Sequence, residues 1–255
     1  MASSGEKNIF LELEYIGTSY FGFQIQNKKN RSEVTVQKVL EDALQKLFGR
    51  KIRVVYSSRT DRGVHARGQA VNFTVNTGIA LQRIKSALNS FLPSDVYIKK
   101  IRQVPLHFHS RFDAKTKVYR YIILNKKKPS VFLKDFSWHI GNRLNLETMK
   151  KSGNILTGLK DFSALAKEAK KYKDCLREIK KIEIKKKGSL IYIDIEATGF
   201  LRNMARNIVY LMVNISAGSI DIKQIDSIIN KKADYVNKPA PPQGLYLQKV
   251  NYINP

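Results

Sequence analysis

The sequence predicts an α+β fold built from two halves of similar organisation. In the first half, segments that alternate apolar and polar residues and segments with helical spacing follow one another in the order β-α-β-β-α-β. This is the order of a ferredoxin-like fold. The second half repeats much of that succession, although the two halves do not match in sequence. With 255 residues, the chain can bury a substantial core in one large or two small domains.

Each element of the first half has a local signal. The first strand alternates until Gly17, and the first helical pattern stops at Gly49. β-branched and aromatic residues favour the two central strands, and Pro93 ends the second helix. In chain order we expect a strand at 9–15, a helix at 36–47, strands at 52–56 and 69–75, a helix at 81–91 and a strand that starts at 96–98.

The second half begins near Arg111 and has comparable signals. A turn at Lys187-Gly188 separates two strand-like runs. The helix expected at 201–217 is predicted to be buried, because its apolar residues cover more than one face. The expected elements are a strand at 118–123, a helix at 146–156, strands at 175–185 and 190–197, the helix at 201–217 and a strand at 245–252.

The charge indicates a polyanionic partner. The chain has 46 Lys and Arg residues against 21 Asp and Glu residues, a formal net charge of +25. Such a charge attracts polyanions and favours contacts with phosphates. A genome's base composition can also enrich lysine. We favour nucleic acid because the excess runs through the whole chain together with aromatic residues. A membrane surface fits less well, since no long amphipathic basic helix is apparent.

Other classes of site find little support. One cysteine, Cys175, excludes an intrachain disulfide and leaves no cysteine cluster for zinc. The four histidines lack the spacing of a helical metal site, so we expect no metal. The amino terminus has no signal-peptide pattern, and no apolar stretch is long enough to span a bilayer. We expect a soluble cytoplasmic protein.

The segment 58–66 is the most suggestive of chemistry. It places Asp61 between Arg59 and Arg62, in a turn that contains Gly63. A neighbouring guanidinium favours the ionised carboxylate, which is the form that acts as a nucleophile or a general base. The ordinary alternative is a surface turn with structural ion pairs, and for an isolated aspartate that alternative is the better one.

Further segments resemble one family, the TruA-type tRNA pseudouridine synthases. Six matches occur in the family's order and extend from about residue 10 to residue 252, so coincidence is very improbable. The matching segments are 15–26 with 36–37, 59–66, 108–114 with 117–121, 161–163, 199–207 and 244–247.

The resemblance implies a fold and a reaction. The fold would be the pseudouridine synthase fold: two ferredoxin-like subdomains, residues 1–108 and 109–255, sharing an extended mixed or antiparallel sheet with a central cleft. The enzyme would be an isomerase that converts uridine to pseudouridine in the anticodon stem-loop of tRNA, at tRNA positions 38–40. The substrate supplies every atom of the product, so no cofactor is implied. The family is typically a homodimer.

The resemblance also assigns roles to residues. Asp61 would act on the ribose of the target uridine, either by attack at C1′ or by removal of the 2′ proton. Tyr119 would stack on the flipped uracil and is a candidate base for the C5 proton. Arg206 would pair with Asp61, and Leu245 would form part of the apolar wall. The basic residues expected to bind the RNA substrate are Arg59, Arg62, Lys28, Lys29 and Arg31.

Without the family, some of these residues would be read differently. Tyr119 and Leu245 would be read as core residues. Arg206 lies in an apolar helix, where a charge is costly unless it is paired, so the bare sequence already asks for a buried partner.

The sequence departs from the family pattern at several positions. None of the departures removes a proposed catalytic group, but they leave substrate range and local hydrogen bonding open. The departures are Ile16, Phe23, Ser58, Arg62, Lys160 and Asn203.

Rival functions remain at this point. The same isomerisation could act on another tRNA arm or on a different RNA, because loops select the target by shape. A non-catalytic RNA-binding protein on this scaffold is a second rival, against which the retention of Asp61, Tyr119 and Arg206 argues. A small-molecule enzyme fits poorly with the charge.

Overall fold

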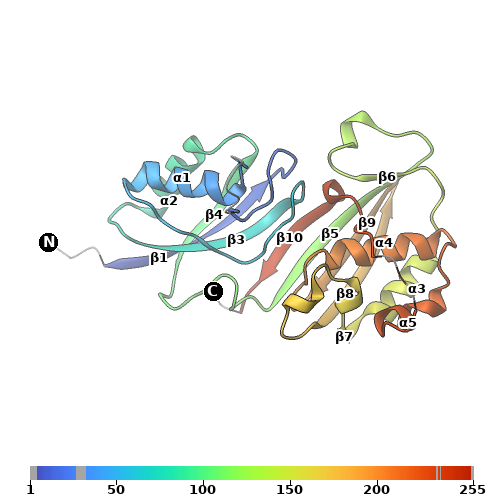
Figure 1. Cartoon of the computed structure of the whole chain (residues 1–255). Helices are drawn as coiled ribbons and strands as arrows, with labels where there is room; N and C mark the ends of the chain where they lie inside the picture. Colours follow the sequence, from blue (N-terminus) through green and yellow to red (C-terminus); the bar gives the residue numbers. More distant parts are fainter. Residues whose placement is uncertain (1–4, 27–32, 234, 236, 254–255) are drawn as a thin grey trace. The chain divides into compact units, whose positions relative to one another are not determined.

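A computed structural model describes residues 5–26, 33–233, 235 and 237–253 of the chain (Figure 1). These residues form two compact units. Unit 1 comprises 1–115 and 247–255, and unit 2 comprises 116–246. Within the described residues, no helix is both long and apolar enough to cross a membrane.

Unit 1 has the predicted ferredoxin-like order. Its strands follow the order β4-β1-β3, and β2 and β10 both adjoin β3. The pairings of β1 with β3, β1 with β4 and β2 with β3 are all antiparallel. In chain order its elements are β1 (Glu6–Tyr15), α1 (Val36–Phe48), β2 (Val55–Tyr56), β3 (His65–Asn76), α2 (Leu81–Phe91) and β4 (Val96–Val104), joined by most of β10 (Leu245–Asn251).

The main core of unit 1 lies between its sheet and its two helices. Ile9, Leu11 and Leu13 alternate along β1 and are fully buried. The buried residues of α2 are Ile84 and Leu88, and this helix packs on β4 and on α1. Figure 1 shows the two helices together beside β1, β3 and β4. The apolar face of each helix therefore packs against the same layer of strands, as the amphipathic spacing in the sequence predicts.

Unit 2 contains a mixed sheet. Its strands follow the order β5-β9-β8-β7 with antiparallel pairing, and β6 pairs with β5 in parallel. Its remaining elements are helices that include the long α4. In chain order the elements are β5 (Thr116–Asn125), β6 (Trp138–Ile140), α3 (Leu146–Leu156), β7 (Gly158–Asp161), β8 (Leu176–Lys187), β9 (Leu190–Ala197), α4 (Met204–Ser216) and α5 (Ile225–Ile229).

The helix expected at 201–217 is buried, as predicted, because most residues of α4 have little exposed surface. It begins three residues later than expected. Asn203 has a φ of 62°, in the left-handed region, so the backbone becomes helical only after it. Asparagine adopts that region more readily than most residues do, which suits this departure from the family pattern.

The α+β class is confirmed, and so are the helices predicted at 81–91 and 146–156, with their bounds. One predicted strand is shorter than expected. The strand at 52–56 is reduced to β2, because the amide of Val54 donates to the side chain of Glu41 and not to a neighbouring strand. The division after residue 108, the shared sheet and the central cleft stay predictions.

Candidate active site

Asp61 lies in unit 1, in the loop between β2 and β3 that we call the Asp61 loop, residues 57–64. Asp61 is half-buried, whereas Arg59 and Arg62 are exposed. The amide of Val64 donates to the carbonyl oxygen of Asp61 over 3.1 Å and closes the turn. The loop thus presents its carboxylate from a hydrogen-bonded turn with arginines on both sides.

A glutamine of β3 holds the start of the loop. Gln69 is fully buried, and its Nε2 donates to the carbonyl oxygen of Ser58 over 2.7 Å. The amide of Ser58 donates back to Oε1 of Gln69 over 3.3 Å. Because both contacts use the backbone of Ser58, they do not depend on which side chain stands there. The loop can therefore keep these hydrogen bonds with serine at position 58, although serine departs from the family pattern there.

The segment that follows β1 supports the middle of the loop. The amide of Phe23 donates to the carbonyl oxygen of Thr60 over 3.1 Å, and the hydroxyl groups of Tyr15 and Thr60 share a hydrogen bond of 2.8 Å. A Cβ at Gly22 would lie 2.6 Å from the Thr60 oxygen, and one at Gly17 would overlap the carbonyl oxygen of Val64. The glycines in the amino-terminal motif therefore allow the two backbones to approach.

Arg62 also contacts this segment. Its guanidinium lies over the ring of Phe21, with Cζ 4.2 Å from the ring centroid. A cation above an aromatic face is an attractive arrangement. The larger residue that departs from the family pattern after Asp61 is thus accommodated by stacking on Phe21.

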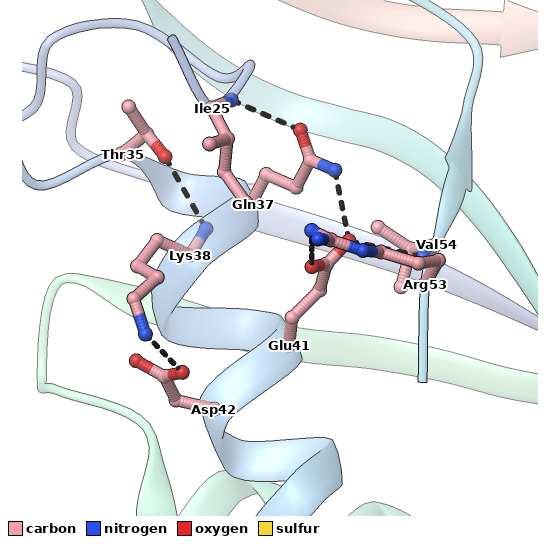
Figure 2. Close-up of polar contacts among 8 residues, drawn as sticks. All are labelled: Ile25, Thr35, Gln37, Lys38, Glu41, Asp42, Arg53 and Val54. Atoms are coloured by element: carbon pink, nitrogen blue, oxygen red, sulfur yellow. Dashed lines mark hydrogen bonds and ion pairs between the residues drawn. The ribbon is translucent and has the colours of Figure 1, made fainter. Parts of the chain in front are cut away.

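A polar network around Gln37 and Glu41 of α1 holds the segment that follows β1, which it contacts at Ile25 (Figure 2). Oε1 of Gln37 accepts from the amide of Ile25 over 3.0 Å, and Nε2 of Gln37 donates to Glu41 over 2.8 Å. Glu41 accepts further bonds from Arg53 over 2.8 Å and from the amide of Val54 over 3.2 Å. Gln37 and Glu41 together connect the chain before α1 with the chain that leads into β2.

The other candidate residues lie in unit 2. Tyr119, on β5, is 6% exposed, and its ring meets Phe200 edge to face at 4.8 Å. Arg206 lies in the first turn of α4, where its Nε donates to the carbonyl oxygen of Ala240 over 2.6 Å. The amide of Ala240 donates in return to the carbonyl oxygen of Arg206 over 3.2 Å. Leu245 is buried at the start of β10.

The outcomes for the predicted site differ between residues. Asp61, Arg59 and Arg62 lie on one loop of unit 1, and Tyr119, Arg206 and Leu245 lie within unit 2. The pairing of Asp61 with Arg206 stays a prediction. Lys28, Lys29 and Arg31 lie outside the described residues. In the part of the chain that the structure describes, no group of three or more His, Cys, Asp or Glu side chains is arranged to hold a metal ion.

Sequence reasoning did not find the residues that support the Asp61 loop. Gln69 and His65 are buried polar residues of β3: Gln69 bonds the backbone of Ser58, and Nδ1 of His65 accepts a hydrogen bond from the amide of Gly17. A polar residue at a strand position that packing should make apolar is a signal for a buried hydrogen bond. Glu41 gave no such signal, since charged residues are common on a surface helix.

Comparison with known proteins identifies relatives along the chain. A family model described as tRNA pseudouridine synthase matches residues 13–113 and 154–253. The chain is 40% identical to a protein named tRNA pseudouridine synthase A from Thermoanaerobacter sp. (strain X514), over 96% of this chain and 100% of that protein. A protein of the same name from Acetivibrio thermocellus is 37% identical over the same shares. One named tRNA pseudouridine synthase A 2 from Bacillus cereus is 31% identical, over 96% of this chain and 99% of that protein.

Proposed function

The chain belongs to the tRNA pseudouridine synthase family, and from this premise we propose that it isomerises uridine in the anticodon arm of tRNA. The observation that carries the proposal is the Asp61 loop. Its backbone is held by Gln69, by Phe23 and by the close approach of Gly22. A carboxylate on so constrained a loop is positioned before substrate binds, which is what an efficient catalytic group requires.

In the proposed reaction, the Asp61 carboxylate acts on the ribose of a flipped uridine. It either attacks C1′ or removes the 2′ proton, and the N1–C1′ bond breaks. The freed uracil turns, and its C5 bonds to C1′ as the Asp61–C1′ bond breaks or, in the second route, as the 2′ proton returns. C5 then loses its proton and N1 gains one, so that the product is an isomer of the substrate and no other reactant is consumed.

Three residues of unit 2 would complete the site. Tyr119 would stack on the uracil and is the candidate acceptor for the C5 proton. Arg206 would pair with Asp61 and keep it charged. Leu245 would form part of the apolar wall. The short contacts of Arg206 with Ala240 and of Tyr119 with Phe200 support these roles, because they restrict how each side chain can move.

The basic residues would bind the RNA backbone. Arg59 and Arg62 flank Asp61, and their exposed side chains can reach phosphates next to the flipped nucleotide. Lys28, Lys29 and Arg31, which precede α1 in the sequence, would add further contacts. We further propose that the protein works in the cytoplasm as a homodimer in which one RNA spans both subunits.

Mapping of the modified bases tests the proposed substrate. Purified protein is incubated with a set of transcribed tRNAs, and carbodiimide treatment followed by primer extension locates each pseudouridine. Stops confined to the anticodon arm are the expected result. Stops in another arm, or in a non-tRNA transcript alone, would overturn the substrate assignment while leaving the isomerisation intact.

A further inference from the structure

Unit 1 contains a cavity of about 610 Å³, separate from the Asp61 loop. Four strands contribute to its lining: β1, β3, β4 and β10. Phe10 and Glu12 of β1 face it, and they alternate with the fully buried Ile9, Leu11 and Leu13. The register places Arg102 beside Phe10 and Lys100 beside Glu12. Phe10 and Glu12 therefore reach the cavity from the face of the sheet opposite to those buried β1 residues, and Gln82 and Lys85 of α2 complete its lining.

The described lining is strongly basic. Its cationic residues are Lys85, Lys99, Lys100, Arg102 and Lys249. Among the described lining residues, the one carboxylate is Glu12. Such an excess of positive charge in a concave site concentrates anions.

Hydrogen bonds fix several of these cations in place. Nζ of Lys99 and Nζ of Lys100 each lie 3.1 Å from the Glu12 carboxylate. Nζ of Lys85 donates to the carbonyl oxygen of Lys99 over 2.6 Å. Burial alone would raise the pKa of Glu12, but its bonds to the two lysines hold it below the ordinary value. Glu12 thus stays ionised and organises the ammonium groups, without neutralising the cavity.

Two buried polar atoms in the lining need a partner. The guanidinium of Arg102 lies over the Phe10 ring at 4.4 Å, and among the described residues nothing accepts a hydrogen bond from its buried Nε. Oε1 of Gln248 is buried as well, and among the described residues nothing donates a hydrogen bond to it. A buried donor without an acceptor costs free energy. An anion with several oxygens would supply the acceptor for Arg102, and a hydroxyl group on the same ligand would suit Gln248.

The geometry points to a phosphate-binding pocket for the RNA backbone. The volume lies within the range of about 300–1,000 Å³ that small ligands occupy, and a ribose phosphate offers both oxyanions and a hydroxyl group. Lys249 is exposed, and the Lys100 side chain is 70% exposed, so a continuous strand can reach the rim. That the strand belongs to tRNA rests on the proposed function.

The test compares two pairs of substitutions that remove equal charge. Arg102→Gln with Lys100→Gln removes the pocket contacts. Arg50→Gln with Lys51→Gln is the matched control, since both residues are exposed in unit 1 and neither lines the cavity. Binding of a fluorescent tRNA is followed by anisotropy at several salt concentrations, and tritium release from C5-labelled tRNA gives kcat and KM.

We expect the pocket pair to weaken tRNA binding about tenfold and to lower the salt slope by about one to two phosphate equivalents. KM should rise while kcat is retained, and the control pair should change binding about twofold or less. Equal effects of the two pairs would show that the positive charge of the whole surface, and not the pocket, attracts the RNA, and would overturn the proposed pocket. Lys100→Gln with Lys249→Gln repeats the test on exposed residues, in case Arg102→Gln disturbs the Phe10 packing.

Inorganic phosphate distinguishes the source of the anion. We expect calorimetry with inorganic phosphate alone to show weak binding or none. The pocket pair of substitutions should abolish any phosphate binding that the wild type shows. Phosphate binding that depends on the pocket, together with tRNA binding that does not, would overturn the RNA assignment. The proposed function can fail separately. If the wild type releases no tritium but the pocket pair still weakens tRNA binding, the isomerase proposal fails and the pocket stands.

Discussion

The ring of Tyr121 occupies the space that a side chain at Gly244 would need. A Cβ at Gly244 would lie 2.6 Å from Cζ and 2.9 Å from the hydroxyl oxygen of Tyr121. The Tyr121 ring is fully buried, and its hydroxyl donates to the carbonyl oxygen of Pro241 over 2.7 Å. Burial raises the pKa of Tyr121 well above its ordinary value, so the hydroxyl keeps the proton that it donates. The segment that leads into Leu245 is thereby fixed against β5 within unit 2.

Gly244→Ala should destabilise the fold, because Tyr121 can make room only by losing its bond to Pro241. Overpacking of this kind costs about 1–3 kcal/mol in the free energy of unfolding. Urea denaturation measures that cost. Gly141→Ala is the control, since its Cβ would meet an oxygen of Lys127 at an ordinary 3.6 Å. Similar stabilities for the two variants would show that Tyr121 moves freely.

Gln69→Leu should lower activity more than it lowers RNA binding. The change removes both hydrogen bonds to Ser58 and leaves buried backbone groups without their partner, at a cost of about 1–3 kcal/mol each. The Asp61 loop would lose its fixed start, so kcat for tritium release should fall while the Kd for tRNA stays within about threefold. Gln45→Leu, at an exposed position, should change neither quantity. Full activity in Gln69→Leu would show that this clamp does not position the loop.

Glu41→Ala should destabilise the protein much more than the neighbouring substitution Asp42→Ala. Glu41 is buried and accepts bonds from Gln37, Arg53 and Val54, of which the first and last are buried. Each buried donor left without an acceptor costs about 1–3 kcal/mol. Asp42 forms an exposed ion pair with Lys38, and such pairs are worth about 0–1 kcal/mol. Thermal unfolding of both variants measures the difference, and equal shifts in Tm would contradict the network.

Glu12 should contribute to stability in a pH-dependent way. Burial works to raise its pKa, but Lys99 and Lys100 hold the pKa of the folded state below the ordinary value of 4.5. A lowered folded-state pKa gives stability that is present above the unfolded value and is lost as the pH falls through the folded value. The stability difference between wild type and Glu12→Gln should therefore shrink between pH 7 and pH 3. A difference that is constant over this range would mean that the two lysines do not stabilise the carboxylate.

Much of the fold could be predicted because the pattern that determines it is local. The helices at 81–91 and 146–156 have apolar residues at helical spacing and clear ends, so their bounds are correct. The short strands β6 and β7 and the short helix α5 were not predicted, because segments of three to five residues carry too little periodicity. The reduction of β2 depends on Glu41, a contact across 13 positions that no local pattern contains.

The candidate site was predicted less completely than the fold. The Asp61 segment stood out because two arginines flank an acid in a turn, and the family resemblance gave it a role. The supporting contacts of Gln69, Tyr15 and Gln37 could not be predicted, since each joins positions that become neighbours only when the sheet and α1 assemble. Strand pairing and helix docking, not residue type, decide which polar side chains meet.

If the Asp61 carboxylate carries out the isomerisation, its replacement by an amide should abolish the reaction. Tritium release from tRNA labelled at C5 of uridine measures this, with wild type, Asp61→Asn and the exposed control Asp42→Asn compared at equal tRNA occupancy. We expect release by the wild type and the control, and loss of release in Asp61→Asn while tRNA binding is kept. Unchanged release by Asp61→Asn would show that another group carries out the isomerisation.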